Sequence, residues 1–533
     1  MLKKVVKTIV KIIKESIKLC FIIFLFFCLF LSIALRLGTD WAKINYNYSS
    51  FDEILYTLGT SVTTASEEVL DDFFATNIYP PLYTVLIVFS IFIVFCLVYK
   101  IFFRNSSVIL NIRILKKNFP IKFSFLTIIV LILTCVFGIM LHSSVVYAMD
   151  QLYINEYLET TAQSSTFFEE EYVNPQDVKL DFPEKKRNLI YIYLESMEST
   201  YTDKRHGGAY NINYIPELTD LAEDNVNFSS TNLVGGAHMP YGASWTMGGM
   251  VAQTSGVPIK TPFIVAHDEN QEINYANGLV NGAYSLGEIL EEEGYNQYIM
   301  VGSDLSFGGR RTYFTEHGNY QVYDYYTAIE DGLIDEDYYV WWGYEDEKLF
   351  DYAKDELEKI AENDEPFNFT MLTVDTHAVE GYTSDFCENR YDNHYLNSVA
   401  CSSEQLEDFI DWIQDQDFYK NTTIILAGDH LSMNNSAFVD INDSDRHVFN
   451  VYINSAVKPS KEKNREFTTF DYYPTTLASL GVKIQGNRLG LGTNLFSNKE
   501  TLSEEYGNDY IDSELQKSSS YYNSCITLNG CRN

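Results

Sequence analysis

Charged side chains follow directly on short apolar runs at several places in this 533-residue sequence. Glu195 follows the run 189–194, and the pair Asp429–His430 follows the run 423–426 after two small residues. A carboxylate beside an imidazole is a usual ligand pairing for a divalent metal ion. An acidic residue at such a place is more often a helix cap or a surface residue. The metal-site interpretation therefore requires that these residues lie at the same edge of the fold. The Asp429–His430 pair is the candidate metal site, and Glu195 is expected at the same sheet edge.

Two further residues at such positions are suited to phosphate chemistry. His377 follows the run 367–374, and Arg310 follows two glycines after the run that ends at Val301. A guanidinium group binds a phosphate through two parallel hydrogen bonds, and an imidazole titrates close to neutral pH and can move a proton. The alternatives are a surface salt bridge for Arg310 and a structural role for His377.

A candidate nucleophile lies in the glycine-rich segment 242–250, which leads into a helical stretch of small residues. Ser244 and Thr246 both carry a hydroxyl there. A hydroxyl at a helix N-terminus that binds a metal ion becomes nucleophilic near neutral pH. The alternative is that either residue merely caps the helix.

The elements that must position these residues are alternating strands and helices. Apolar runs suited to strands lie at 189–194, 298–301, 367–374, 423–426 and 448–453. Helical spacing of apolar residues occurs within 349–360, within 406–413, where Ser402 resembles an N-cap, and within 471–480. Strands that are apolar on both faces suit a parallel sheet covered on both sides. We therefore expect an α/β fold with a largely parallel sheet, in which active sites lie beyond the carboxyl ends of the strands.

The first quarter of the chain has the composition of a membrane domain. The segments 19–35, 81–99 and 123–141 are apolar and close to the roughly 20 residues that cross a bilayer. Lysine and arginine gather before the first segment and between the second and third, whereas the loop after the first is acidic. Positive loops stay in the cytoplasm, which predicts a cytoplasmic N-terminus and an extracytoplasmic chain after the third span. A cleaved signal peptide ending at residues 32–34 is the alternative for the first segment.

Charge divides the chain in the same way. Residues 1–149 hold 14 Lys and Arg against 8 Asp and Glu, within a whole-chain net charge of −35. The acidic remainder excludes a nucleic-acid partner, because phosphate backbones are bound by basic surfaces. The predicted organisation is a membrane domain at 1–147, a linker at 148–187, a catalytic domain at 188–497 and a tail at 498–533.

Four of the eight cysteines lie in the outer part of the chain, namely Cys387, Cys401, Cys525 and Cys531. Four cysteines allow three pairings. Cys387–Cys401 and Cys525–Cys531 are favoured because each closes a short loop.

Taken together, these segments resemble the alkaline-phosphatase/sulfatase superfamily. Within it they are most similar to the membrane-anchored phosphoglycerol transferases of the membrane-derived-oligosaccharide (osmoregulated periplasmic glucan) type, which are related to lipoteichoic acid synthase. The resemblance runs from about residue 188 to 497 through separate segments, which are 194–196, 242–252, 372–377, 401–402, 427–430 and 488–492. It implies an α/β/α sandwich and transfer of glycerol phosphate from phosphatidylglycerol, a membrane lipid, to a hydroxyl of a cell-envelope glycan.

The resemblance also implies a role for each candidate residue. The family's metal ligands fall on Glu195, Thr246, Asp429 and His430, and its threonine nucleophile falls on Thr246. Its phosphoglycerol-contacting histidine and arginine fall on His377 and Arg310. The implied cofactor is one divalent ion, Mn²⁺ in the synthase branch, with Mg²⁺ or Zn²⁺ as alternatives.

The sequence departs from the family pattern at three points. Ala243 replaces a threonine that is frequent in relatives, which leaves Ser244 as the alternative nucleophile, and Gly308 replaces a tryptophan of the synthase. Three expected spans, rather than five, put polymer synthesis in question. A phosphoethanolamine transferase and a membrane-tethered glycan or lipid sensor are the competing functions, whereas a sulfatase would need a C/S-x-P-x-R motif that this sequence lacks.

Overall fold

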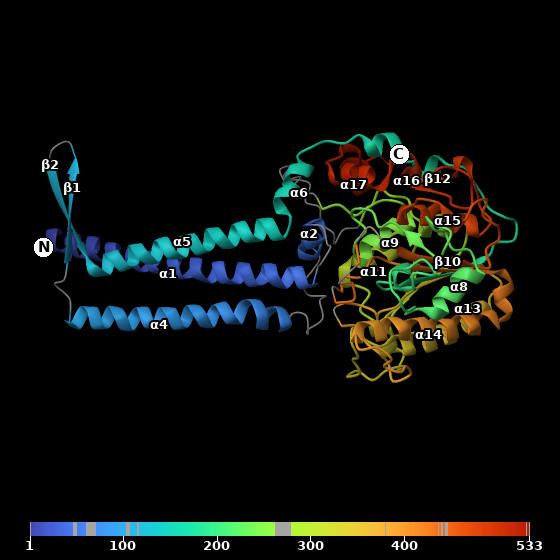
Figure 1. Ribbon diagram of the computed structural model, residues 1–533, viewed down its shortest axis with the longest axis horizontal. Helices are drawn as coiled ribbons and strands as arrows, with labels where there is room; N and C mark the ends of the chain where they lie inside the picture. The colour runs from blue at the N-terminus through green and yellow to red at the C-terminus, as the bar shows by residue number, and fades with distance from the viewer. Residues whose placement is uncertain are drawn as a thin grey trace. The chain divides into compact units, whose positions relative to one another are not determined.

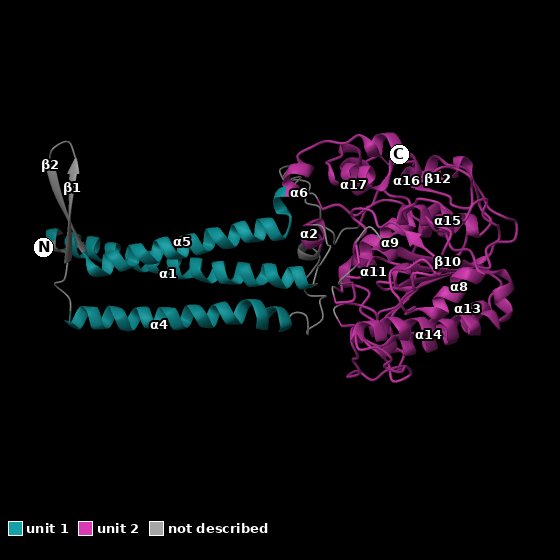
Figure 2. Ribbon diagram, in the orientation of Figure 1, with its two compact units in different colours: residues 1–44, 66–155 teal, residues 45–65, 156–533 magenta. Residues whose placement is uncertain are grey.

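The structure is a computed structural model of the chain. It describes residues 2–45, 51–59, 71–102, 107–114, 117–261, 279–378, 380–434, 436–438, 441–442, 446–528 and 530–531. The chain forms two compact units, coloured separately in Figure 2. Unit 1 comprises residues 1–44 and 66–155, and unit 2 comprises residues 45–65 and 156–533.

Unit 1 contains three long apolar helices, α1 (Leu2–Asn45), α4 (Tyr79–Phe102) and α5 (Phe125–Gln151). All three are long and apolar enough to cross a membrane, and most of their apolar side chains face outward, as lipid-facing side chains do. The ring of Phe26 in α1 lies 4.9 Å from that of Phe89 in α4 and 5.7 Å from that of Phe137 in α5. Helix α1 therefore packs against both of the others (Figure 1).

The first two apolar segments of the sequence lie within helices α1 and α4, and the third lies in α5 except at its start. The expected third span began at Phe123, but that residue belongs to a hairpin of β1 (Ser107–Ile114) and β2 (Lys117–Ser124). Helix α5 begins only after Ser124, whose hydroxyl accepts the Thr127 N–H as an N-cap.

Unit 2 is built on a seven-stranded sheet in the order β5-β10-β9-β4-β8-β6-β7. The strands are β4 (Asn188–Leu194), β5 (Gly236–Ala237), β6 (Asn296–Val301), β7 (Gln321–Tyr323), β8 (Phe367–Leu372), β9 (Thr422–Gly428) and β10 (Val448–Ile453). Every expected strand is present, and among these seven only β10 runs against the others. The prediction of a largely parallel sheet is confirmed.

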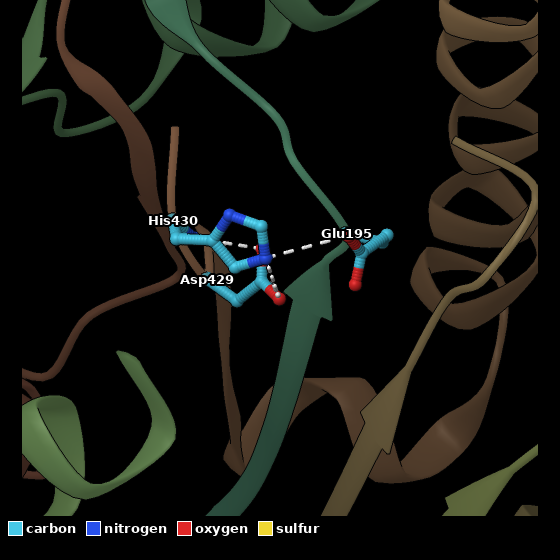
Figure 3. A group of neighbouring side chains, drawn as sticks. All are labelled: Glu195, Asp429 and His430. Atoms are coloured by element: carbon cyan, nitrogen blue, oxygen red, sulfur yellow. Dashed lines mark hydrogen bonds and ion pairs between the residues drawn. The ribbon is translucent and has the colours of Figure 1, made fainter. Parts of the chain in front are cut away.

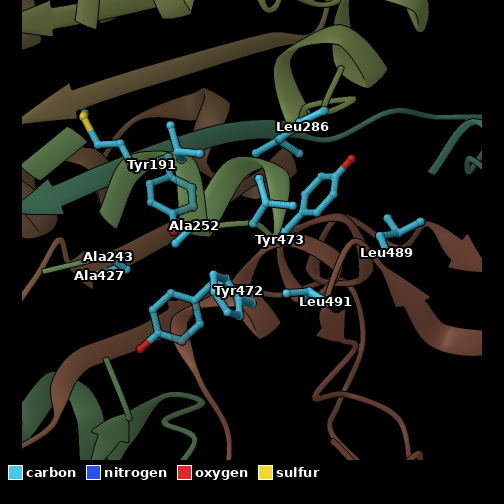
Figure 4. Close-up of a cluster of buried hydrophobic side chains, with 14 of the residues drawn as sticks. Tyr191, Ala243, Ala252, Leu286, Ala427, Tyr472, Tyr473, Leu489 and Leu491 are labelled. Carbon is cyan, nitrogen blue, oxygen red and sulfur yellow. The ribbon is translucent and has the colours of Figure 1, made fainter. Parts of the chain in front are cut away.

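Both faces of this sheet are buried. Along β4, Tyr191 and Tyr193 join one apolar cluster while Ile190 and Ile192 join the other, as the two-residue period of a strand requires. The first face is covered by α9 (Thr246–Ser255), α10 (Leu286–Glu292) and α15 (Tyr472–Ser479), and the second by α8 (Pro216–Asp224), α13 (Asp346–Ala361) and α14 (His394–Gln414). Figure 4 shows Tyr191, Tyr472 and Tyr473 in the first cluster. The expected α/β/α sandwich is confirmed.

The segment 148–187, expected to be a linker, is folded. Helix α5 runs to Gln151, and α6 (Ile154–Thr161), α7 (Phe167–Glu171) and β3 (Leu180–Asp181) follow. Phe168 is 1% exposed and belongs to the core of unit 2. The acidic residues of α7 suggested a solvated connector, but its two phenylalanines supply core packing on the opposite face of the helix.

The C-terminal segment is also part of unit 2 rather than a separate tail. Helices α16 (Leu502–Tyr506) and α17 (Asn508–Gln516) place Ile511 and Leu515 in the core cluster that contains Phe168. The Cys525–Cys531 and Cys387–Cys401 pairs are both bonded.

Helix α14 starts earlier than expected. The N-cap expected at Ser402, as a capping box with Gln405, is wrong, because Ser402 lies inside α14 and is buried. The cap is Asn393, whose side chain accepts the Leu396 N–H. Apolar residues upstream of Ser402 continue the helical spacing, and a buried serine inside a helix has the same sequence appearance as a cap.

Candidate active site

Three predicted ligand residues meet where β4 and β9 end. Leu194 pairs with Gly428 in the parallel register of these strands, so the next residues, Glu195 and Asp429, emerge side by side. The ligand-type atoms of Glu195, Asp429 and His430 all lie within 4.8 Å of one another. His430 Nε2 is 3.4 Å from Glu195 Oε1 and 3.4 Å from Asp429 Oδ2 (Figure 3). These three side chains, called the metal cluster below, are at most 2% exposed.

Hydrogen bonds among residues at the two strand ends fix the orientation of the metal cluster. The backbone N–H groups of Ser196 and His430 both donate to Asp429 Oδ1 at 2.8 Å. The Ser196 hydroxyl donates to Glu195 Oε1 at 2.8 Å. His430 Nδ1 donates to the Leu431 carbonyl at 2.8 Å, which directs Nε2 toward the carboxylates. Among the residues that the structure describes, Asp429 Oδ2 has no hydrogen-bond donor although it is buried, as is expected of a carboxylate oxygen that serves as a metal ligand.

The pKa values of the three residues also bear on whether the metal cluster can hold a cation. Burial and the neighbouring Glu195 raise the pKa of Asp429 to about 8. Burial lowers the pKa of His430, but both carboxylates outweigh it and raise that pKa to about 10. Burial likewise raises the pKa of Glu195, and the His430 cation outweighs it, so the net shift is downward. With these pKa values, protons on Asp429 and His430 balance the charge on Glu195, and a divalent ion can replace those protons because two carboxylates and an imidazole are a donor set that fits one.

Thr246 stands at the first position of helix α9, and its side chain reaches the metal cluster. Its Oγ1 is 3.4 Å from Glu195 Oε2 and 3.5 Å from His430 Nε2. Unlike the cluster, Thr246 is partly exposed, so a substrate can reach it. The N-terminus of a helix favours negative charge, which suits an alkoxide or a phosphate at this position.

Close packing holds helix α9 on the strand ends. A Cβ on Gly249 would lie 2.1 Å from the Asp429 carbonyl oxygen, so only glycine permits this approach. Gln253 Nε2 donates to the Gly428 carbonyl at 2.8 Å. Among the described residues, Thr246 and not Ser244 bonds the cluster, because Ser244 donates instead to Glu53 at 3.4 Å.

Arg310 begins helix α11 (Arg310–Glu316), which follows β6 in sequence, and is buried at 6% exposure. Its Nε donates to the Phe307 carbonyl at 3.0 Å and its Nη2 to the Asp304 carbonyl at 2.9 Å. Gly308 and Gly309 have φ of +64° and +79°, and this left-handed turn leads into the helix that Arg310 begins. A buried guanidinium held by carbonyls contradicts the alternative of a surface salt bridge.

His377 follows β8 on the same edge of the sheet. Its Nδ1 donates to the Ala378 carbonyl at 2.6 Å, and its ring centroid lies 4.6 Å from that of Trp342. Burial lowers the pKa of His377 and of Arg310, and the Glu195 carboxylate opposes the shift in both. The interactions with Glu195 place both residues in the electrostatic field of the metal cluster.

Two parts of this site were not predicted from the sequence. Trp342 packs on His377, and Phe307 packs on Trp342 with a centroid distance of 5.6 Å. Helix α2 (Phe51–Gly59), which precedes the second apolar helix in sequence, belongs to unit 2 and contacts the segments that carry Thr246 and Arg310. The acidic residues of α2 served only to predict membrane topology, and no local pattern distinguishes them from a solvated loop.

Comparison with known proteins agrees with this geometry. The family model described as Sulfatase matches residues 187–482, more than half of the chain, and the chain therefore belongs to that family. A model described as Ion transport protein matches residues 1–109, which hold apolar helices and none of the metal cluster.

Curated relatives carry a more specific name. Phosphoglycerol transferase I of Salmonella choleraesuis (strain SC-B67) is 33% identical over 333 residues, which is 61% of this chain and 41% of that protein. Its namesake from Salmonella typhi matches to the same extent. The chain thus spans well under half the length of these relatives.

Two solved structures are similar at low identity. The lipooligosaccharide phosphoethanolamine transferase of Neisseria meningitidis is 13% identical with a TM-score of 0.48, covering 85% of this chain and 83% of that one. A lipoteichoic acid synthase from Listeria monocytogenes is 18% identical with a TM-score of 0.44, covering 60% and 79%. At these scores neither likeness supports a functional conclusion.

Proposed function

We propose that this member of the Sulfatase family is a membrane-anchored phosphoglycerol transferase. It moves sn-glycerol 1-phosphate from phosphatidylglycerol to a hydroxyl of a cell-envelope glycan and releases diacylglycerol. The observation that carries the proposal is the Thr246 hydroxyl at the N-terminus of α9, within 3.5 Å of two buried ligand residues. The name of the Salmonella relatives supports the choice of phosphoglycerol as the transferred group.

The reaction proceeds through a covalent ester of Thr246. The Thr246 hydroxyl loses its proton and its Oγ1 attacks phosphorus, the bond to the diacylglycerol oxygen breaks, and that oxygen takes a proton. The acceptor hydroxyl then loses its proton and attacks the same phosphorus, the bond to Thr246 Oγ1 breaks, and Oγ1 takes a proton, which returns Thr246 to its free form. A divalent ion, Mn²⁺ by analogy with the synthase branch, would be held by the metal cluster and Thr246, and it supplies stabilisation of charge on the attacking and phosphoryl oxygens.

Arg310 and His377 are assigned to the phosphoglycerol group. Arg310 neutralises the phosphate and orients it for in-line attack. His377 moves the proton of the leaving or entering oxygen, and its lowered pKa keeps the imidazole neutral and able to accept that proton near neutral pH.

The three apolar helices are proposed to anchor the enzyme beside its lipid donor. With a cytoplasmic N-terminus and three spans, unit 2 lies on the extracytoplasmic side of the plasma membrane, where phosphatidylglycerol and envelope glycans are both accessible.

The test uses the full chain in phosphatidylglycerol vesicles with Mn²⁺ and donor labelled in its headgroup. We expect diacylglycerol release and a labelled adduct that peptide mapping assigns to Thr246. Thr246→Ala should abolish the adduct, and Ser244→Ala, the matched control two residues away, should retain it. An adduct that survives Thr246→Ala would refute the assigned nucleophile.

The same assay distinguishes the competing functions. Label transfer from phosphatidylethanolamine alone would indicate a phosphoethanolamine transferase, and glycerol-phosphate chains on the acceptor would indicate a polymerase. Reversible lipid binding without turnover would indicate a sensor.

A further inference from the structure

Tyr56 of helix α2 touches both segments that carry the proposed catalytic groups. Its hydroxyl donates to the Gly308 carbonyl at 2.5 Å, two residues before Arg310. Its ring lies 5.4 Å from that of Trp245, the residue that caps α9 directly before Thr246. At 2% exposure, the Tyr56 side chain is an interior group between these segments.

Asp52 ties α2 to the two ends of the segment that contains α9. One carboxylate oxygen accepts the Tyr241 hydroxyl, and the other accepts the Thr261 N–H at 2.9 Å. Tyr241 precedes the glycine-rich turn and Thr261 follows the helix, and the segment is closed by a bond from the Ile259 N–H to the Gly242 carbonyl at 3.0 Å. Asp52 and Tyr56 are four residues apart and therefore lie on the same face of α2.

Glu53 adds a third contact, because its carboxylate accepts the Ser244 hydroxyl at 3.4 Å. Asp52 and Glu53 are each only 2% exposed. Burying two carboxylates is costly unless each is hydrogen-bonded, so this docking is a built interface rather than an incidental surface contact.

We propose that α2 completes the active site and that Tyr56 is its positioning residue. By bonding the Gly308 carbonyl and packing on Trp245, Tyr56 sets the distance between Arg310 and Thr246, and thus the alignment of the phosphate with the nucleophile. Alignment errors of about 1 Å cost roughly 100-fold in rate, so two catalytic groups on separate segments need such a connection. Helix α2, which lies between the first two apolar helices in sequence, thereby forms part of the reaction centre of unit 2.

The inference rests on the proposed roles of Thr246 and Arg310, so a second substrate that does not require the proposed lipid donor is used beside phosphatidylglycerol. Full-length Tyr56→Phe keeps the ring on Trp245 and loses the hydroxyl that bonds the Gly308 carbonyl. Tyr295→Phe is the matched control, because its buried hydroxyl donates to the Arg187 carbonyl at 2.8 Å, at the opposite edge of the sheet. Both variants are assayed for adduct formation from phosphatidylglycerol and for hydrolysis of bis(p-nitrophenyl) phosphate, with melting temperatures measured alongside.

We expect Tyr56→Phe to lower the maximal rate on both substrates by about tenfold, while Tyr295→Phe leaves both rates within about twofold at a similar melting temperature. Equal rates for the two variants would overturn the inference. If the wild-type protein hydrolyses the phosphodiester but does not use phosphatidylglycerol, the proposed donor fails, and the inference is then judged on the phosphodiester alone.

A double-mutant cycle separates positioning from general stability. If Tyr56 acts through the Arg310 loop, Tyr56→Phe should cost less than about twofold in an Arg310→Ala background. Residual phosphodiester hydrolysis provides the readout. A full second tenfold loss would show that Tyr56 does not act through Arg310. If both single variants are too slow to measure, amide exchange of residues 307–311 is compared in Tyr56→Phe and Tyr295→Phe, and faster exchange in Tyr295→Phe or in neither would count against the inference.

Discussion

The metal cluster and the residues around it are built in different ways. Glu195, Asp429 and His430 follow two hydrogen-bonded neighbouring strands, and their carboxylates are fixed by hydrogen bonds from residues at the ends of the same two strands. The surrounding residues Arg310, His377, Trp342 and Tyr56, called the substrate side below, come from four separate segments.

The two regions are also held by different forces. Charge-assisted hydrogen bonds fix the metal cluster, whereas aromatic contacts join much of the substrate side, from Phe307 to Trp342 to His377 and from Tyr56 to Trp245. Strand ends supply a precise and rigid reaction centre, and loops supply contacts that can change with the substrate. We infer that the cluster sets the chemistry of this fold and that the substrate side sets which headgroup it accepts.

Asp429→Asn is expected to have the largest effect on the metal cluster. It keeps the shape of a metal-cluster ligand but removes its charge, so we expect a loss of more than about 10³-fold in transfer and loss of the metal. The wild-type melting temperature should rise with added Mn²⁺, because a ligand that binds only the folded state stabilises it, and that of the variant should not.

Asp471→Asn is the matched control for this substitution. Asp471 is also buried and accepts two backbone N–H groups, at 2.8 and 2.6 Å, but lies outside the metal cluster. It should lower the melting temperature yet retain the Mn²⁺ response. If Asp429→Asn kept that response, Asp429 would not be a ligand.

A smaller effect is expected from Ser196, which orients the cluster without being a proposed ligand. Removing such a supporting hydrogen bond typically weakens metal affinity by about 10- to 100-fold. Ser196 has φ of +54°, a left-handed conformation whose strain alanine shares with serine and glycine relieves, so Ser196→Ala and Ser196→Gly remove the same hydroxyl with different backbone strain. Titration with Mn²⁺ should show the same loss in both variants, with a higher melting temperature for glycine than for alanine. Unchanged affinity in both would mean that the backbone alone orients Glu195.

The difference between the metal cluster and the substrate side also explains which parts of the site could be predicted from the sequence. Every expected strand is present, because a continuous apolar run indicates a strand that is buried on both faces. The register of β4 and β9 then brings Glu195, Asp429 and His430 together at the ends of these strands. The packing of α2 and of Trp342 depends on contacts between segments hundreds or tens of residues apart, for which no local pattern exists. The segment 148–187 was expected to be a linker for the same reason. Phe168 is buried by a C-terminal segment far away in sequence, with its ring 4.9 Å from that of Tyr522.

On the substrate side, Trp342 is predicted to control how His377 titrates. Burial lowers the pKa of His377, and the Trp342 ring contributes to that burial. Trp342→Ala should let water in and raise this pKa toward its ordinary value near 6.5. If neutral His377 accepts a proton, the acid limb of the rate profile moves to higher pH, with a loss of up to about fourfold at pH 6, where a group with a pKa near 6.5 is about one quarter neutral. Trp342→Phe should move it less, and an unshifted limb in both variants would exclude His377 as the titrating group.

The smallest predicted effect concerns Asp52, which holds α2. Burial raises its pKa to about 6, although the Tyr241 hydroxyl, the Thr261 N–H and the Lys260 cation each lower it. Since the ordinary value is 3.8, the docked form binds more protons than the undocked form between these values, and docking weakens as pH rises through 6. The change from pH 5.5 to 7 corresponds to about fourfold in the docking equilibrium.

Protection of the α2 amides against hydrogen exchange, corrected for the intrinsic effect of pH, measures this difference. Asp52→Asn should remove the dependence, because an amide cannot ionise, while Tyr241 and Thr261 remain as partners. A matched rise in protection at low pH within β4, where no such carboxylate is buried, would assign the effect to global stability instead. A dependence confined to α2 would show that this helix docks by an equilibrium of its own, whereas the strand ends behind it stay fixed.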